Sequence, residues 1–358
     1  MTGFEGRRQV LAGRLSERKL QAALVSQGVN LRYLTGFTGD NGALLLAADG
    51  AVLLTDPRFE IQAAQEVTCE VKIAKGPLAR EIVREIRRRR WRRVGYEASR
   101  VTCEVFEQLK ARLGASARLE PMPGWIEELR MVKSAEEIAL IRNSVETNSQ
   151  AFEQTVARTR PGIKEQDLAA ELEYRMRRLG AEKPSFDTII AGGARGALPH
   201  ASPTAAQIRT GELVVVDMGA QQQGYCSDMT RMLHFGVPSG KVKRTYRAVL
   251  EAQLAAIDAV RPGATVASVD RMARQTLEKH GLREAFVHST GHGLGLEIHE
   301  APRIGRRGKG KLASGMAITI EPGVYLADFC GVRIEDTVLV TATGYEVLTP
   351  TSKDLRVL

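Results

Sequence analysis

Short apolar runs alternate with amphipathic stretches along the first part of the chain. Strands are predicted where the runs AALVS, GALLLAA, AVLLTD and VGYEA occur, at residues 22–26, 42–48, 51–56 and 94–98. Stretches with helical periodicity lie between or after them, at residues 57–67, 78–89 and 105–113. This alternation predicts an α/β domain. A Pro-Met-Pro-Gly sequence interrupts the pattern, so we expect one domain at 1–123 and a second at 124–358.

The second domain follows a different pattern, in which pairs of helices precede pairs of strands. Ser134 and Glu137 form an S-x-x-E capping box, which predicts the start of a helix. Further helices are predicted at 164–179, 241–260 and 266–280, and strand-like runs at 212–235 and 316–340. Because a helix pair followed by a hairpin occurs twice, we expect an α+β domain with a weak internal duplication.

Both predicted hairpins carry pairs of carboxylates in otherwise apolar strands. Asp217 and Asp228 flank a Gln-Gln-Gln-Gly turn, and Glu321 and Glu335 flank an Ala-Asp-Phe-Cys-Gly turn. Antiparallel pairing is expected to bring the members of each pair opposite each other, or nearly so. Like charges that face each other destabilise a sheet, unless cations neutralise them. Four carboxylates balance two divalent cations, so the pattern predicts a site for two metal ions.

Histidines gather between the two hairpins. The segment HSTGHGLGLEIHEAP contains His288, His292 and His299, half of the six histidines in the chain. Imidazole is both a common metal ligand and a proton carrier near neutral pH. The glycines of this segment argue against a helix and for backbone that packs closely against its surroundings. His200 lies in a second Gly/Pro-rich stretch, GGARGALPHASPT, which is typical of a binding loop.

Six motifs follow one another from about Leu129 to the C-terminus: LPHASP, VVDMGA, YCSDMTR, GHGLGLEIHEAP, TIEPGVY and GVRIEDTVLV. They resemble the signature set of the pita-bread metallopeptidases and, within that superfamily, of the Xaa-Pro peptidases, prolidase (Xaa-Pro dipeptidase) and aminopeptidase P. Nearer the N-terminus, YLTGFTGDNGALL resembles the substrate-side loop of prolidase-type N-terminal domains. The resemblance implies a creatinase/prolidase-type α/β N-terminal domain followed by an α+β pita-bread catalytic domain.

The resemblance also implies how the metal ligands are shared. Asp217 would bind one ion, His292 and Glu321 the other, and Asp228 and Glu335 would bridge both. Two such ions, about 3.5–4 Å apart, can activate water and polarise the scissile carbonyl. An oxygen-rich site with one imidazole suits Mn²⁺ best, and Co²⁺ or Zn²⁺ could substitute.

Four further residues are implied to act around the ions. His200, His288 and His299 would line the substrate pocket and stabilise or shuttle protons around the tetrahedral intermediate. Arg333 would hold a ligating carboxylate in place.

The implied reaction is hydrolysis of the Xaa-Pro bond at the N-terminus of dipeptides or short peptides. This bond is a tertiary amide, so the enzyme needs a ring-shaped pocket and a proton for the departing prolyl nitrogen. A prolidase acting on dipeptides and an aminopeptidase P acting on longer peptides both remain open, and the short N-terminal domain favours the dipeptidase. The resemblance further implies a homodimer. A catalytically silent binding module of the same fold is the alternative class, which the intact ligand positions disfavour.

The charge distribution adds one further candidate. The net formal charge is +9, of which +7 falls in residues 1–123, with a focus at REIRRRRWRRVGYEA. Basic patches with an aromatic residue can bind nucleic acid. A helix whose cationic last turn complements its dipole, followed by a buried strand, accounts for the same residues. We favour the second interpretation, so no nucleic-acid partner is expected.

The remaining features concern location and bystanders. No run of about 18 apolar residues occurs, and no apolar segment follows the first arginines, so neither a membrane span nor a secretory signal is expected. The four cysteines form no C-x-x-C motif, which suits a reducing cytoplasm. His234 and His280 are expected to take no part in the site. Cys226 either faces the metal pocket or is a small buried thiol, and the second is favoured.

Overall fold

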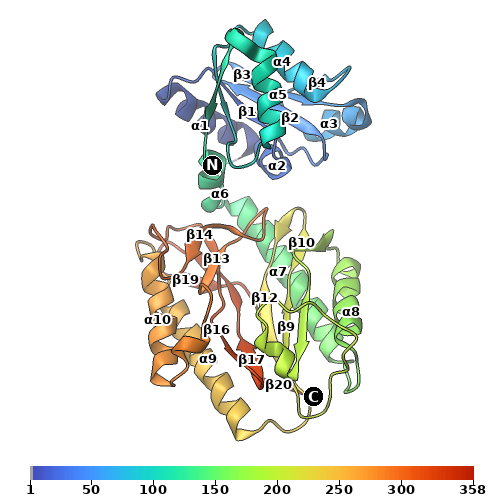
Figure 1. Cartoon of the computed structure of the whole chain (residues 1–358), viewed down its shortest axis with the longest axis vertical. Helices are drawn as coiled ribbons and strands as arrows, with labels where there is room; N and C mark the ends of the chain where they lie inside the picture. Colours follow the sequence, from blue (N-terminus) through green and yellow to red (C-terminus); the bar gives the residue numbers. More distant parts are fainter. Residues whose placement is uncertain (1–2) are drawn as a thin grey trace. The chain divides into compact units, whose positions relative to one another are not determined.

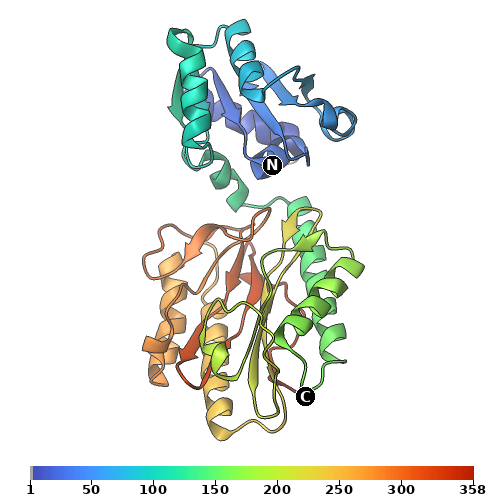
Figure 2. The same cartoon turned by 45° about the vertical axis from the view of Figure 1, so that its right-hand side comes forward.

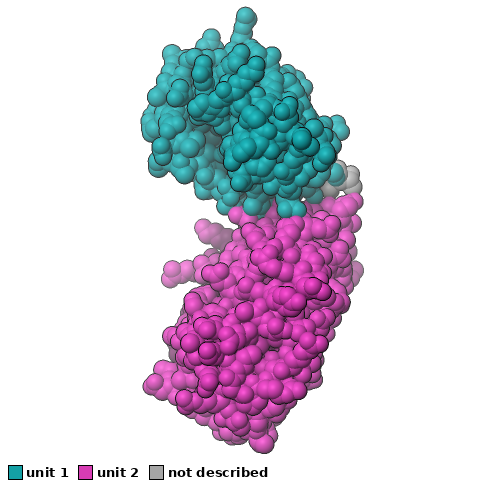
Figure 3. Space-filling model, turned by 90° about the vertical axis from the view of Figure 1, so that its right-hand side faces the viewer, with its two compact units in different colours: residues 1–130 teal, residues 131–358 magenta. Residues whose placement is uncertain are grey.

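The computed structural model describes residues 3–358. These residues form two compact units, and the division falls between Arg130 and Met131. Figure 3 colours the two units separately. Throughout the described range, no helix combines the length and the apolar composition that crossing a bilayer requires.

The division lies later in the chain than the boundary predicted after residue 123. Helix α6 (Trp125–Met131) follows that predicted boundary and packs on the first unit. Ile126 of this helix is only 1% exposed. Tyr33 Oη donates a hydrogen bond to the carbonyl oxygen of Leu129 at 3.2 Å. The Pro/Gly sequence therefore turns the chain within the first unit, and the chain passes to the second unit at the last residue of α6.

The first unit contains a six-stranded sheet with the order β4-β3-β2-β1-β5-β6, drawn in blue to teal in Figure 1. The pairs β1–β2 and β2–β3 are antiparallel, and the other neighbours are parallel. The strands are β1 Ala22–Val25, β2 Gly42–Ala47, β3 Gly50–Thr55, β4 Glu70–Ile73, β5 Arg93–Tyr96 and β6 Arg118–Pro121. The helices before α6 are α1 Gly3–Glu17, α2 Gly28–Thr35, α3 Glu60–Glu66, α4 Leu78–Arg88 and α5 Cys103–Leu113.

The central strands are buried on both faces, which explains why their sequences are continuously apolar. Leu45 shares a core with Ile86 of α4 and Leu109 of α5, and its buried neighbours in the strand point to the opposite face. The predicted α/β domain is confirmed. Helix α1 was not predicted, because Arg7 and Arg8 occupy buried positions on it and disguise its apolar face.

The second unit has two main sheets, β20-β12-β9-β8 and β14-β13-β15-β18-β19. Helices α7 and α8 lie beside the first sheet and α9 and α10 beside the second (Figures 1 and 2). The helices are α7 Ala135–Val156, α8 Glu165–Arg178, α9 Gly240–Asp258 and α10 Val266–Lys279. The strands are β7 Lys183–Pro184, β8 Ile189–Gly192, β9 Leu213–Met218, β10 Ala220–Gln222, β11 Tyr225–Cys226, β12 Met229–His234, β13 Gly291–Gly293, β14 Glu300–Ile304, β15 Ala317–Ile320, β16 Gly323–Leu326, β17 Cys330–Arg333, β18 Asp336–Val340, β19 Tyr345–Val347 and β20 Arg356–Val357.

The predicted capping box begins α7. Ser134 Oγ accepts from the backbone N–H of Glu137 at 3.3 Å, and a Glu137 carboxylate oxygen accepts from the backbone N–H of Ser134 at 3.0 Å. Two of the N–H groups that a helix start leaves without helical partners are thereby satisfied.

The registers of the two hairpins decide how their carboxylates meet. In the first hairpin Asp217 pairs with Thr230, so Asp228 lies diagonally across on the same face rather than opposite. In the second, Ile320 pairs with Asp336, and the next position along each strand is a glutamate, so Glu321 faces Glu335. The prediction of facing pairs holds directly for the glutamates and diagonally for the aspartates.

Candidate metal centre

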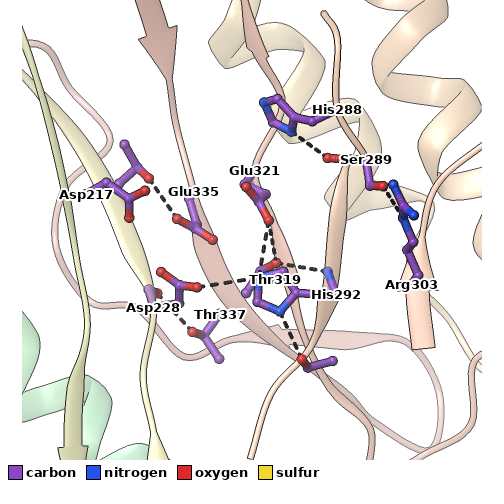
Figure 4. Close-up of polar contacts among 12 residues, drawn as sticks. Asp217, Asp228, His288, Ser289, His292, Arg303, Thr319, Glu321, Glu335 and Thr337 are labelled. Carbon is purple, nitrogen blue, oxygen red and sulfur yellow. Dashed lines mark hydrogen bonds and ion pairs between the residues drawn. The ribbon is translucent and has the colours of Figure 1, made fainter. Parts of the chain in front are cut away.

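Five side chains from both main sheets converge on one point (Figure 4). Asp217 lies on β9 and Asp228 immediately precedes β12, whereas Glu321 follows β15, Glu335 precedes β18 and His292 lies on β13. His292 Nε2 is 3.4 Å from Glu321 Oε1 and 3.5 Å from Asp228 Oδ2. Asp228, His292 and Glu335 each offer one atom, and these atoms lie within 4.8 Å of one another. The packing of the sheets therefore unites all five predicted ligands.

Three carboxylate oxygens at this point are buried and accept no hydrogen bond from any described residue. They are Asp217 Oδ1, Asp228 Oδ1 and Glu335 Oε1. Burial, and then the neighbouring carboxylates, raise the pKa of Asp228 and of Glu335 well above the usual range. Such oxygens are costly to bury without a partner, and a divalent cation supplies one. The residues present therefore fit a metal centre.

The other oxygens of these carboxylates are held by neighbouring side chains. Arg333 Nη2 donates to Asp217 Oδ2 at 2.5 Å. Thr230 Oγ1 donates to Glu335 Oε2 at 2.7 Å. Each contact fixes one oxygen of its carboxylate and leaves the second oxygen available to bind a metal ion. Thr230 was not predicted from the sequence. Its place on β12, where it pairs with Asp217 of β9, could have identified it.

His292 is oriented by the backbone around it. Its Nδ1 lies 2.9 Å from the carbonyl oxygen of Gly293, so Nδ1 carries the proton and Nε2 points its lone pair at the carboxylates. The flanking glycines allow this close packing. A Cβ on Gly291 would lie 1.9 Å from the carbonyl oxygen of Thr319, and one on Gly293 would lie 2.2 Å from that of Ala301. The expectation of closely packed backbone is confirmed.

His288 is bonded on both ring nitrogens. Nε2 lies 2.8 Å from Tyr325 Oη, and Nδ1 lies 2.8 Å from the carbonyl oxygen of Ser289. Because Arg333 Nη1 donates to Tyr325 Oη at 2.6 Å, the tyrosine hydroxyl donates to His288. Burial lowers the pKa of His288, which agrees with a neutral ring in this arrangement. Tyr325 was not predicted, since only the fold brings it between His288 and Arg333.

A cavity of about 620 Å³ adjoins the five residues. His200, His288 and His299 all line it, as does Arg333. The rings of His292 and His299 lie 4.4 Å apart between centroids. Burial is the largest cause that lowers the pKa of His299. Further lining residues are Phe186, Asp187, Ile189, Pro199, Ile298, Glu300 and Arg303.

The expected bystanders lie outside this cavity. His234 Nδ1 contacts the carbonyl oxygen of Gly236 at 2.8 Å. His280 follows α10, and its Nε2 contacts Glu251 at 2.7 Å. Cys226 is a buried thiol that does not line the cavity, and burial raises its pKa to about 12.

Oxygen-rich donors with one imidazole, at the wall of a cavity large enough for a small substrate, define the class of metal-dependent hydrolases. The comparisons agree with this class. The model of metallopeptidase family M24 matches residues 139–342, and that of the creatinase/prolidase N-terminal domain matches residues 7–132. The chain therefore belongs to metallopeptidase family M24, and the predicted two-domain pita-bread architecture is confirmed.

Full-length relatives support the same assignment. An Xaa-Pro dipeptidase of Pyrococcus horikoshii is 36% identical over 95% of this chain and 96% of its own length. The structure of an Xaa-Pro dipeptidase from Bacillus anthracis superposes with a TM-score of 0.96 at 36% identity, covering 99% of this chain and 100% of that one. An X-Pro aminopeptidase from Thermotoga maritima gives a TM-score of 0.92 at 34% identity, covering 98% and 100%.

Proposed function

We propose that this protein is an Xaa-Pro dipeptidase that uses two divalent metal ions. The observation that carries the proposal is the set of three buried carboxylate oxygens that have no hydrogen-bond partner among the described residues, at the wall of a cavity that Arg303 also lines. The relatives described as Xaa-Pro dipeptidases support the substrate class. Mn²⁺ is the proposed ion, because the donors are mostly carboxylates with a single imidazole.

The five donors are those that the family resemblance implies. Asp217, Asp228, His292, Glu321 and Glu335 would together hold the two ions. When bound, the ions supply Lewis-acid polarisation of the scissile carbonyl and activation of water. Arg333 keeps Asp217 in place through its hydrogen bond.

The three histidines that line the cavity are proposed to have two different roles. The prolyl nitrogen carries no proton in the substrate, so it must gain one as it departs. His200 and His299, which are exposed at the cavity, are proposed to handle that proton. His288 has both nitrogens engaged, so its proposed role is to orient Tyr325 and, through it, Arg333.

Arg303 favours dipeptides over longer peptides. Its Nε donates to Ser289 Oγ at 2.6 Å, which fixes the base of an exposed guanidinium at the cavity. No described carboxylate forms an ion pair with Arg303. A dipeptide ends in a free prolyl carboxylate that can pair with this group, whereas a longer peptide has a neutral amide there.

A dipeptide amide isolates this single difference. We expect the parent protein to hydrolyse an Xaa-Pro dipeptide at least about tenfold more efficiently than the same dipeptide amide, the effect of one charged hydrogen bond. Arg303→Met should remove most of that preference, and Arg307→Met, which changes an exposed arginine just after β14, is the matched control. Equal rates on both substrates would favour an aminopeptidase P, the second candidate, which the similarity to the Thermotoga maritima enzyme supports.

The remaining proposals concern assembly and location. The resemblance to compact prolidases supports a homodimer, which light scattering at micromolar concentration tests. The four free cysteines support a cytoplasmic location. No nucleic-acid partner is proposed, so modest salt should barely alter turnover.

A further inference from the structure

Lys133, which directly precedes the N-cap residue of α7, makes a buried contact with the loop that carries the site histidines. Lys133 Nζ lies 3.1 Å from Glu300 Oε2, and the two side chains are 1% and 5% exposed. Lys133 Nζ also donates to the carbonyl oxygen of Met131 at 3.3 Å. Glu300 directly follows His299 and lines the cavity. A buried charge pair therefore forms part of the wall of the candidate active site.

The second oxygen of Glu300 reaches into the loop itself. Glu300 Oε1 accepts a hydrogen bond from the backbone N–H of Glu297 at 3.2 Å. Gly295 leaves the space for this carboxylate, because a Cβ at that position would lie 2.8 Å from Glu300 Oε1. The carboxylate thus occupies the inside of the segment 294–300, which joins His292 to His299.

The contacts close into a circuit through the first carboxylate hairpin. The carbonyl oxygen of Gly295 accepts from the backbone N–H of Cys226 at 2.7 Å. The adjacent Tyr225 donates from its hydroxyl to Glu137 Oε1 at 3.0 Å. Glu137 belongs to the capping box of α7, four residues after Lys133. One helix start therefore holds both the histidine loop and the strand that leads to Asp228.

We propose that Lys133 and Glu300 form a brace that positions the segment 294–300, and with it His299, against the metal centre. The consequence for catalysis rests on the proposed function. Both residues are positioning residues, because neither is one of the five proposed metal ligands or one of the two histidines proposed to handle the proton. Buried ion pairs add little net stability compared with apolar side chains of similar size. We therefore expect the pair to contribute to the position of the segment 294–300 and not to the overall stability of the protein.

Two single variants and one double variant test whether the pair positions the segment 294–300 or only fills a buried space. Lys133→Met and Glu300→Gln each remove the counter-charge of the other residue, whereas the double variant Lys133→Met/Glu300→Leu replaces the pair by apolar side chains. Lys133→Arg keeps the charge. Lys72→Met is the matched control, since Lys72 also pairs with a buried glutamate, Glu85, at 2.9 Å.

Backbone amide exchange, read by mass spectrometry with and without Mn²⁺, is the readout that does not depend on activity. Exchange over 294–300 is expected to accelerate in both single variants and to stay fast in the double variant, whose melting temperature returns toward that of the parent. Turnover of an Xaa-Pro dipeptide should fall by about 10–100-fold in all three, the range for supporting residues around a metal site, with KM changed less than kcat. Lys133→Arg should recover most of the loss, and Lys72→Met should match the parent.

A double variant with parental exchange and turnover would overturn the proposal, because the pair would then serve burial alone. If the double variant does not fold, unchanged exchange over 294–300 in Glu300→Gln has the same meaning. A parent protein that fails to cleave Xaa-Pro substrates would contradict the proposed function, and the exchange experiment would still decide whether the brace exists.

Discussion

Two glutamates with nearly equal burial behave in opposite ways in the two units. Glu85 on α4 has a side chain that is 6% exposed and forms ion pairs with Lys72, Arg88 and Arg89. Those partners, Arg88 foremost, lower its pKa to about 2. Glu335 is buried as deeply beside other carboxylates, and its pKa is raised well above the usual range by burial and then by its neighbours.

The difference shows what separates a structural carboxylate from a ligand. Burial alone opposes ionisation of both groups. The chain itself supplies the cations that pair with Glu85, so its negative charge is neutralised without an added ion. Glu335 accepts from a threonine hydroxyl on one oxygen and has no hydrogen-bond partner among residues 3–358 on the other. A buried carboxylate like Glu335 needs a cation from solution. Its hydrogen-bond and ion-pair partners identify such a metal ligand better than its burial does.

Removing a ligand tests this comparison most severely. Asp228→Ala or Glu335→Ala should lower kcat/KM by at least about 10³-fold even at saturating Mn²⁺, because several kcal/mol of charge stabilisation in the transition state are lost. Elemental analysis should show less bound metal in each variant. His280→Ala, at the end of a helix outside the cavity, should keep the parental rate. Near-parental turnover in either ligand variant would contradict the assignment.

His299→Ala sharpens the boundary between ligands and proton carriers. It should lower kcat by about 10²-fold, the usual contribution of a general acid or base, while the metal content stays near that of the parent. A steady-state assay combined with elemental analysis measures both quantities. Loss of metal in proportion to activity would mean that His299 is a ligand.

The raised pKa values predict how stability responds to pH without metal. A group whose folded pKa is raised contributes most below its unfolded pKa, and the contribution is lost as the pH rises through the folded pKa. The melting temperature gained on adding Mn²⁺ should therefore be larger at pH 7 than at pH 5, because metal binding also requires deprotonated ligands.

The variant Asp228→Asn separates charge from metal binding. Without metal at pH 7 it should melt higher than the metal-free parent, by about 2–4 °C for each kcal/mol of relieved repulsion. Asp167→Asn, on the exposed first turn of α8, is the control and should not stabilise the protein. A lower melting temperature for Asp228→Asn would show that the buried carboxylates are not in conflict.

The smallest effect is expected at the paired glutamate. Glu85→Gln should destabilise the first unit by about 1 kcal/mol, since its hydrogen bonds are partly retained and its cations are half-exposed. Urea unfolding measures this loss, and metal content should not change. Because the pKa of Glu85 is lowered, its contribution is present above the unfolded pKa and is lost as the pH falls toward about 2.

The sequence by itself determined the features that depend on neighbours along the chain. Helix starts such as the Ser134–Glu137 box, the apolar strands and the turns between the carboxylates follow from local periodicity and turn residues. The four carboxylates of the proposed metal centre could be named because each hairpin brings chain neighbours together, and the family resemblance singled out His292 among the histidines.

Only the tertiary structure decided which distant groups meet. The contact of Tyr325 with His288, that of Thr230 with Glu335 and that of Lys133 with Glu300 join segments 37, 105 and 167 residues apart. The hydrophobic periodicity of the sequence does not reveal such contacts, because a single polar residue can lie equally well in a solvated turn or in a buried network. Helix α1 was hidden for a related reason, since its inward arginines, Arg7 and Arg8, become core residues only once the carbonyl groups of Tyr33 and Leu34 accept their hydrogen bonds. Local patterns encode where the chain folds, while the register and packing of whole sheets determine which side chains share a proton, a charge or an ion.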